Sequence, residues 1–509
     1  MSTTSMTSQD ALWLTMDRPN NLMVIDTVMW FRSVPDWSLV TATVQERLVD
    51  QFPVFRSHAV ADGTGWVWQE VDDFEVSDQL NHVMLPEPGD LAQLRAFVAS
   101  QRSEAFDKSR PMWVMHFIEN VHFADGVVGA AVMARFHHSI ADGIRLTQAV
   151  MGLCDLDPAD VTAVGHNLSK PSSPFAVAKS VATETLSDVA DVGVAATRTV
   201  ADVVGNARDV AMTAAKGDLA GAATSIVEDG RNIFTAGTAA LKFPERFMDV
   251  STLVSSPENR VANDATIPGK FVLSGPSVDT VWSGKPSLAK DADWAPVLDL
   301  DQVKAIGKLT GTTVNDVLLT AVSVGLSRYL REHGDSATDE LIWMVPGSIA
   351  PVEAGVPKEL GNHFALVALR MPIGIDDFHE CLTSMHERMD RIKNSDEALI
   401  TFGLQRGIAM APGPLAAGLT NYFANKAVGV LTNVPGPRTQ MTLAGTPVDG
   451  VLGWAPCSGD QPLTICIFSY NGKVTVGFGA DMALIPDLNR LSELFADGFR
   501  DMYAAIVGD

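Results

Sequence analysis

The chain has 509 residues, which is too long for one ordinary hydrophobic core, and with 46% hydrophobic and 19% charged residues it is not a disordered chain. Its formal net charge of −24 argues against a nucleic-acid-binding protein and against simple electrostatic adhesion to anionic lipid, since both need an excess of Lys and Arg. The 4 cysteines form no CxxC pair, which favours buried free thiols in a reducing compartment over a zinc or dithiol site.

The N-terminus lacks a basic segment followed by an apolar core, so we expect no secretion signal. No uncharged apolar stretch reaches the roughly 18 residues that a spanning helix needs. We therefore expect a cytoplasmic protein, and any contact with the inner membrane or with lipid inclusions would be peripheral.

Residues 21–160 alternate strand and helix patterns. The segments "LMVIDTVMWF" and "WVMHFIENV" are rich in β-branched and aromatic residues and predict strands. Between them, "GDLAQLRAFVASQRSEAF" has apolar residues at helical spacing. The segment "VVGAAVMARF" then predicts a strand that runs directly into His137 and His138.

The paired histidines stand where this strand gives way to a helix. Asp142 and Gly143 open the helix, whose core-facing stripe is formed by Leu146, Ala149, Val150 and Leu153. Successive strand side chains point to opposite faces, so His137 and His138 are not expected to reach one small site together, which disfavours a metal site. Two interpretations remain open on residue types alone: a buried turn capped by Asp142, or one imidazole acting as general base while its neighbour holds the strand end.

Residues 160–265 differ in character. Apolar residues step by threes and fours from Val189 to Ala214, which predicts a long amphipathic helix or a broken pair of helices. Because its polar face carries mostly Asp, this pattern favours a crossover packed on the protein over a helix that lies on membranes or lipid droplets, although both interpretations stay open.

From residue 268 onward the strand and helix patterns resume. The segment "TTVNDVLLTAVSVGLSRYLREHG" predicts a helix capped by Thr313 or Asn315, with Gly334 after its end. Asn471-Gly472 between two alternating runs predicts a hairpin, and a helix closes the chain. The two halves thus share a mixed character that is consistent with two related domains.

The segment "HHSIADG" matches the HHxxxDG motif of CoA-dependent acyltransferases, and further blocks in order resemble the bacterial wax ester synthase/acyl-CoA:diacylglycerol acyltransferase family. These blocks are "SQDALWLTMDRPNNLM", "RPMWVMHFIEN", "TVNDVLLTAV", "ELGNHFALVALRMPIGI", "LTNVPGP" and "PLTICIFSYNGKVTVGFGAD". The chain departs from the family pattern at Asp17 in place of Glu, Met112 in place of Leu and Thr432 in place of Ser.

The resemblance implies a mixed α/β fold with two chloramphenicol-acetyltransferase-like domains and an active-site channel between them. We expect an N-terminal domain over residues 1–165 that carries the motif, a helical Ala/Val-rich crossover or linker over 166–265, and a C-terminal domain over 266–509.

The resemblance also implies His138 as the general base, which takes the proton of an alcohol as its oxygen attacks the thioester of acyl-CoA. His137 and Asp142 would give structural support and Gly143 would form the turn of the motif. No metal and no cofactor are expected, with acyl-CoA as co-substrate.

Six further residues are candidates for substrate contact by resemblance: Asp17, Trp113, Asn315, Asp316, Thr432 and Gly436. Ordinary structural roles compete at most of them. Trp113 could fill the core, Asn315 and Asp316 could cap a helix, Thr432 could bond locally, and Gly436 could form a turn.

The function implied is transfer of a long-chain acyl group from acyl-CoA to diacylglycerol, to a fatty alcohol or to both, giving triacylglycerol or wax esters. One alternative is a relative in the same superfamily with another hydroxyl or an amine as acceptor. The other is a non-catalytic lipid-binding or inclusion protein.

Overall fold

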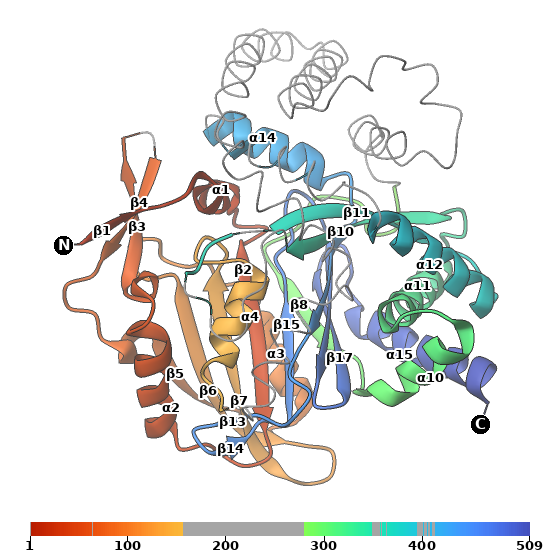
Figure 1. Ribbon diagram of the computed structural model, residues 1–509, viewed down its shortest axis with the longest axis horizontal. Coiled ribbons are helices and arrows are strands. Elements are labelled where there is room, and N and C mark those ends of the chain that lie inside the picture. The colour runs from red at the N-terminus through yellow and green to blue at the C-terminus, as the bar shows by residue number, and fades with distance from the viewer. Residues whose placement is uncertain are drawn as a thin grey trace, which may run out of the picture.

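The computed structural model describes residues 2–63, 65–155, 279–348, 357, 359–362, 364–393, 401, 405, 408–409 and 413–508. Two mixed α/β lobes lie side by side, the N-terminal one on the left of Figure 1 and the C-terminal one on the right. The predicted crossover over residues 166–265, with its amphipathic pattern, lies outside the described residues.

The N-terminal lobe is built on a five-stranded sheet in the order β15-β2-β7-β6-β5. Its strands are β2 (Val24–Phe31), β5 (Leu80–Met84), β6 (Trp113–His122), β7 (Val128–His137) and β15 (Gly450–Trp454). Around it lie α1 (Ser8–Met16), α2 (Trp37–Val44), α3 (Leu91–Arg102), α4 (Gly143–Met151), η1 (Gln45–Val49), η2 (Pro53–Arg56) and η3 (Val76–Gln79). A small sheet in the order β1-β4-β3 lies beside this lobe, with β1 (Thr3–Ser5), β3 (Ser57–Asp62) and β4 (Gly65–Glu70).

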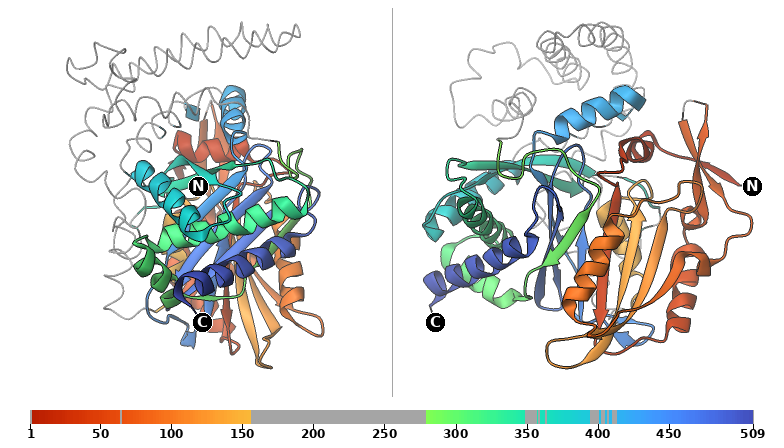
Figure 2. Two further views of the ribbon diagram at one scale, coloured as in Figure 1. Left: turned by 90° about the vertical axis from the view of Figure 1, so that its right-hand side faces the viewer. Right: turned by 180° about the vertical axis from the view of Figure 1, so that it is seen from behind.

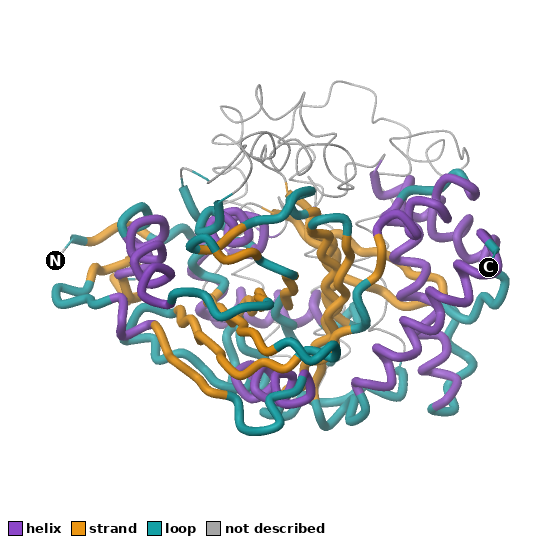
Figure 3. Tube along the Cα trace, turned by 90° about the horizontal axis from the view of Figure 1, so that it is seen from below, coloured by secondary structure: helices purple, strands orange, loops and turns teal. Residues whose placement is uncertain are grey.

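The C-terminal sheet has the order β11-β10-β12-β16-β17-β8, with β9 also paired to β17. Its strands are β8 (Lys290–Trp294), β9 (Leu298–Asp299), β10 (Glu340–Ser348), β11 (Phe364–Pro372), β12 (Gly429–Pro435), β16 (Leu463–Tyr470) and β17 (Lys473–Asp481). The helices of this half are α10 (Leu300–Thr310), α11 (Val314–Glu332), α12 (Phe378–Lys393), α14 (Gly413–Ala424) and α15 (Leu488–Val507), and β13 (Thr442–Leu443) pairs with β14 (Thr446–Pro447). Figures 2 and 3 show α10, α11, α12 and α15 gathered on the side of the sheet that faces away from the N-terminal lobe.

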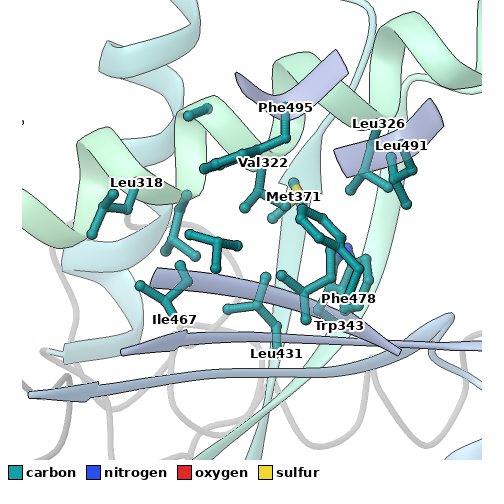
Figure 4. Packing of buried hydrophobic residues seen from close by; sticks show 14 of the residues in the cluster. Leu318, Val322, Leu326, Trp343, Met371, Leu431, Ile467, Phe478, Leu491 and Phe495 are labelled. Atoms are coloured by element: carbon teal, nitrogen blue, oxygen red, sulfur yellow. The ribbon is translucent and has the colours of Figure 1, made fainter. Parts of the chain in front are cut away.

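The largest hydrophobic core lies between these helices and the C-terminal sheet (Figure 4). Side chains of α11 and α15, such as Leu318 and Phe495, pack on strand residues such as Leu431 and Phe478. The two helices cross closely at Gly325, where an added Cβ would lie 2.9 Å from the Cα of Phe495. Each of these helices buries one apolar face against the sheet, which is why apolar residues recur at helical spacing in their sequences.

Most elements expected from the sequence pattern are confirmed. Asp142 is the N-cap of α4, and Thr313 caps α11 in a capping box with Asp316. Gly334 follows α11 with a φ of 82°, and Asn471-Gly472 form the hairpin turn with φ of 47° and 73°. Among the described residues, no single helix has the length and apolar composition to cross a membrane; only α10 and α11 together pass that test, and they meet at a 100° bend.

The sequence pattern does not predict that β15 crosses between the halves of the chain. This strand belongs to the C-terminal half but pairs antiparallel with β2, with Gly450 opposite Trp30 and Trp454 opposite Asp26. The C-terminal half therefore completes the N-terminal sheet, and this shared strand joins the lobes at the edge of the sheet next to β2, opposite β5.

Candidate active site

The paired histidines lie at the end of β7, and neighbouring backbone holds both of them. The His137 amide donates to the Met112 carbonyl at 2.9 Å, and the His138 amide donates to the Met23 carbonyl at 2.7 Å. Met112 directly precedes β6 and Met23 directly precedes β2, so the strands on either side of β7 fix the two residues.

His137 is fully buried and makes a local network. Its Nδ1 accepts from the Ser139 amide at 3.2 Å and lies 2.8 Å from the Ser139 hydroxyl, which assigns the ring proton to Nε2. Nε2 points to Asp17 at 3.8 Å, and Asp17 is itself held by the Met23 amide and Lys108. Burial lowers the pKa of His137 to about 4 despite the opposing effect of Asp17, so the ring is neutral.

His138 enters different surroundings, as strand alternation predicts. Its ring stacks on the indole of Trp13, with centroids 3.9 Å apart and planes inclined by 22°, and Phe364 lies 5.6 Å away. Only 7% of the residue is exposed, and burial lowers its pKa to about 3, although its own carbonyl and the Asn362 side chain favour the protonated form. The imidazole is therefore neutral at pH 7, and its Nδ1 has no hydrogen-bond partner among the described residues.

Asp142 fixes the start of α4 and joins it to the other lobe. Its Oδ1 accepts from the amides of Ile144 and Arg145, both at 3.0 Å, and its own amide donates to the Gly361 carbonyl at 3.1 Å. Gly143 has no positive φ, and a Cβ there would meet nothing within 4 Å, so the turn itself does not require glycine. No described residue therefore fills the space beside Gly143.

The C-terminal lobe contributes a polar side chain that sequence reasoning did not select as a site residue. The Asn362 amide nitrogen donates to the His138 carbonyl at 2.9 Å and to Asp10 Oδ1 at 2.8 Å. Together with the bond from Asp142 to Gly361, residues 361–362 hold the HHSIADG segment at two points. The site thus lies where the two lobes meet.

Comparison with known proteins agrees with this geometry. Residues 6–240 match the model of the wax ester synthase/diacylglycerol acyltransferase catalytic domain, and residues 360–503 match the model of the C-terminal domain of the same family. The chain belongs to the wax ester synthase/diacylglycerol acyltransferase family. Membership makes it an acyltransferase and implies acyl-CoA and an acceptor as substrates.

The similarity to known proteins covers nearly the whole chain. It is 22% identical over 492 residues to O-acyltransferase WSD of Acinetobacter baylyi, covering 95% of this chain and 93% of that protein. The structure of a wax ester synthase/diacylglycerol acyltransferase from Marinobacter aquaeolei VT8 is similar with a TM-score of 0.63 at 17% identity, covering 99% of this chain and 100% of the other. The first condensation domain of the calcium-dependent antibiotic synthetase gives 0.52 at 13% identity, covering 99% and 96%. These likenesses confirm the predicted mixed α/β fold with two chloramphenicol-acetyltransferase-like lobes.

The opening block of this family has a clear place in the structure. It forms α1, which supplies Trp13 to the His138 ring, and Asp17, the C-cap of α1, faces the His137 ring. Asp17 thus lies beside His137 rather than His138. The stacking of Trp13 was not predicted, because a tryptophan in an apolar helix pattern resembles any core residue.

Trp113, Gly436 and Thr432 make their contacts with other parts of the fold in the described part of the chain. Trp113 is 1% exposed, and its indole N–H donates to the Phe55 carbonyl at 2.6 Å within the N-terminal core. A Cβ on Gly436 would lie 2.5 Å from the Ser469 carbonyl oxygen, so this glycine permits close packing against β16. Thr432 lies on β12 opposite Cys466.

Asn315 and Asp316 lie at the start of α11. Asn315 Oδ1 accepts from Asn433 of β12 at 2.8 Å, while the fully buried Asp316 closes the capping box and lies 2.8 Å from Nδ1 of His386. The hydrogen bonds found for these two residues in the described part of the chain do not reach His137 or His138. Their contacts join α11 to β12 and α12.

Proposed function

We propose that this protein transfers a long-chain acyl group from acyl-CoA to diacylglycerol, to a fatty alcohol or to both, with His138 as general base. The observation that carries the proposal is a buried, neutral imidazole, stacked on Trp13 and tied to both lobes, in a chain of this family. The names of the relatives, O-acyltransferase and diacylglycerol acyltransferase, support the choice of acceptors.

The proposed step uses His138 as its base. His138 takes the proton of the acceptor hydroxyl as that oxygen forms a bond to the thioester carbonyl carbon. The tetrahedral oxyanion then collapses, the C–S bond breaks, and the imidazolium returns its proton to the leaving CoA thiolate. A thioester is already activated, so the work of the protein is to position both substrates in the channel between the lobes and to activate the hydroxyl.

His137, Asp142 and Asp17 support His138 in this proposal. The His137 ring lies 3.8 Å from Asp17 at the end of β7, and Asp142 holds the following turn. Trp113, Asn315, Asp316, Thr432 and Gly436 remain proposals as residues that shape the acceptor side. Because the acceptor is a neutral lipid, we also propose peripheral contact with membranes or lipid inclusions.

The test is thiol release from palmitoyl-CoA with chromatographic detection of lipid products. Parallel reactions contain hexadecanol, dioleoylglycerol or no acceptor, with wild type, His138→Ala and His137→Ala. We expect acceptor-dependent ester formation that is lost in folded His138→Ala. The absence of ester from both acceptors, with a folded protein that binds acyl-CoA, would favour another hydroxyl, an amine, or lipid binding alone.

A further inference from the structure

The indole of Trp13 lies against one face of the His138 ring. The two ring centroids are 3.9 Å apart and the planes are inclined by 22°, while the ring of Phe364 lies 5.9 Å from the indole. Trp13 reaches this position from α1 and is 9% exposed. Its Nε1 is buried and has no hydrogen-bond partner among the described residues.

A missing partner alone does not mark a functional site in this protein. The indole nitrogens of Trp282, Trp343 and Trp454 are also buried without a partner among the described residues. These three side chains belong to hydrophobic clusters, where apolar packing surrounds the rings. Trp13 differs from them because its ring contacts the histidine that is proposed as the base.

The proposed reaction needs a hydrogen-bond donor as well as a base. Attack on the thioester moves negative charge onto its carbonyl oxygen, and donors aimed at that oxygen lower the barrier. An indole N–H only donates, so it cannot compete with His138 for the proton of the hydroxyl. The oxyanion and the attacking oxygen share one carbon atom, so the donor and the base must lie close to each other.

The stacked geometry meets this requirement. The N–H of Trp13 lies in the plane of the indole, and the ring nitrogens of His138 lie in the plane of the imidazole. Because the planes are nearly parallel, both groups are directed to the rim of the stack and not to its faces. A thioester at this rim can therefore receive a hydrogen bond from the indole while the imidazole accepts the proton of the hydroxyl.

Other donors near the two histidines are already directed elsewhere. The side-chain nitrogen of Asn362 donates to the His138 carbonyl and to a carboxylate of α1. The Ser139 hydroxyl lies 2.8 Å from Nδ1 of His137, and Nε2 of that ring faces a carboxylate at 3.8 Å. Of these groups, only Trp13 combines contact with the His138 ring and a donor without a partner.

We propose that Trp13 is a catalytic residue whose indole N–H donates to the thioester carbonyl oxygen and stabilises the oxyanion. As the acceptor oxygen bonds to the carbonyl carbon, the C=O π electrons move to this oxygen. On collapse the C=O bond re-forms, the C–S bond breaks, and His138 returns its proton to the CoA thiolate, while the indole keeps its own proton. The inference rests on the proposed function.

The test removes the N–H and keeps an aromatic face. Trp13→Phe retains a ring that can stack on His138 but has no donor. The matched control is Trp343→Phe, which makes the same change at a buried indole in the largest core, where Nε1 also lacks a partner among the described residues. Both variants and the wild type are compared for kcat, KM for palmitoyl-CoA and thermal midpoint.

We expect Trp13→Phe to lower kcat about 10²-fold with KM changed by about twofold or less. Trp343→Phe should lower the thermal midpoint and leave kcat per folded molecule unchanged. If Trp13→Phe does not fold, incorporation of 3-benzothienylalanine at this position replaces the N–H by sulfur in a ring of nearly the same shape, and the same loss of kcat is expected.

A second measurement follows the indole directly. In ¹H–¹⁵N spectra of ¹⁵N-tryptophan-labelled protein, the indole resonance of Trp13, assigned from the variant that lacks it, should move to lower field when palmitoyl-CoA is added. The Trp343 resonance should not move.

An unchanged kcat per folded molecule without the Trp13 N–H would overturn the inference, and so would a Trp13 resonance that stays in place at saturating palmitoyl-CoA. If the wild type transfers no acyl group to any acceptor, the proposed function fails. The Trp13 resonance then still decides whether the indole contacts the acyl group.

Discussion

Two strands in this protein, β17 and β7, are each followed by a helix. The buried polar groups at the ends of these strands differ in how completely they are hydrogen-bonded. β17 ends at Asp481 before α15, and this carboxylate is 1% exposed. It accepts from the amide and hydroxyl of Ser287, from Lys290, and from the amides of Ala483 and Leu484. β7 ends at His137 before α4, and there two buried ring nitrogens, His137 Nε2 and His138 Nδ1, have no hydrogen-bond partner among the described residues.

The difference separates a structural role from a chemical one. A buried polar group with all its bonds satisfied stabilises the fold and has no capacity left for a substrate. A buried imidazole with an unpaired nitrogen weakens the fold slightly and leaves that nitrogen available for a further hydrogen bond. The following predictions test this separation, from the largest expected change in stability to the smallest.

Asp481→Asn should lower the unfolding free energy by about 3–5 kcal/mol, because it leaves Lys290 buried without its counter-charge. Urea unfolding measures the loss, and acyl transfer per folded molecule should stay near the wild-type rate. The double variant Asp481→Asn/Lys290→Met should recover part of the stability. A stable Asp481→Asn protein with impaired acyl transfer would contradict a purely structural role for Asp481.

Acid should destabilise the protein through its buried neutral histidines. Burial lowers the pKa of His137 to about 4, of His138 to about 3 and of His116 to about 4, from an ordinary value of 6.5. Between these values the unfolded chain binds protons that the folded chain does not. The unfolding free energy therefore falls by about 1.4 kcal/mol per histidine for each pH unit below about 6.5, and these groups add no slope above it.

Urea unfolding between pH 6.5 and pH 5 measures this slope. His138→Gln should remove the contribution of one histidine to this slope. The unfolding free energy of the variant should therefore depend less steeply on pH than that of the wild type. Equal slopes in the two proteins would show that the ring of His138 is not held neutral by burial.

Two helix caps offer a smaller comparison. Asp142 caps α4 at the site, and Asp90 caps α3 away from it through the Gln93 amide at 2.9 Å. Replacement by Ala should cost about 1 kcal/mol of stability in each case. Only Asp142→Ala should also slow acyl transfer beyond the loss of folded protein, because Asp142 holds the turn after His138. Equal effects on transfer would contradict a positioning role for Asp142.

The sequence pattern predicts local structure well and the pairing of distant segments poorly. The strands ending at Phe31 and His137 and the caps Asp142 and Thr313 follow from periodicity and capping chemistry. The pairing of β15 with the N-terminal sheet could not be predicted, because a short apolar strand has the same local pattern whichever sheet it joins.

The site shows the same limit. His137, His138 and Asp142 are adjacent in the chain and could be found by spacing. Asn362 and Trp13 contact His138 from segments far apart in the sequence, so their residue types gave no local indication of these contacts. Asn362 does fall in a block that resembles the family, which was the one available signal.

The most direct measurement is the kcat of acyl transfer by His138→Gln, taken with its unfolding free energy at pH 7. The account predicts a loss of about 10²- to 10⁴-fold in kcat with a stability equal to or above that of the wild type at acidic pH and within about 1.5 kcal/mol of it at pH 7. A variant that retains wild-type kcat, or loses activity only in proportion to unfolded protein, would contradict the assignment of His138 as the base.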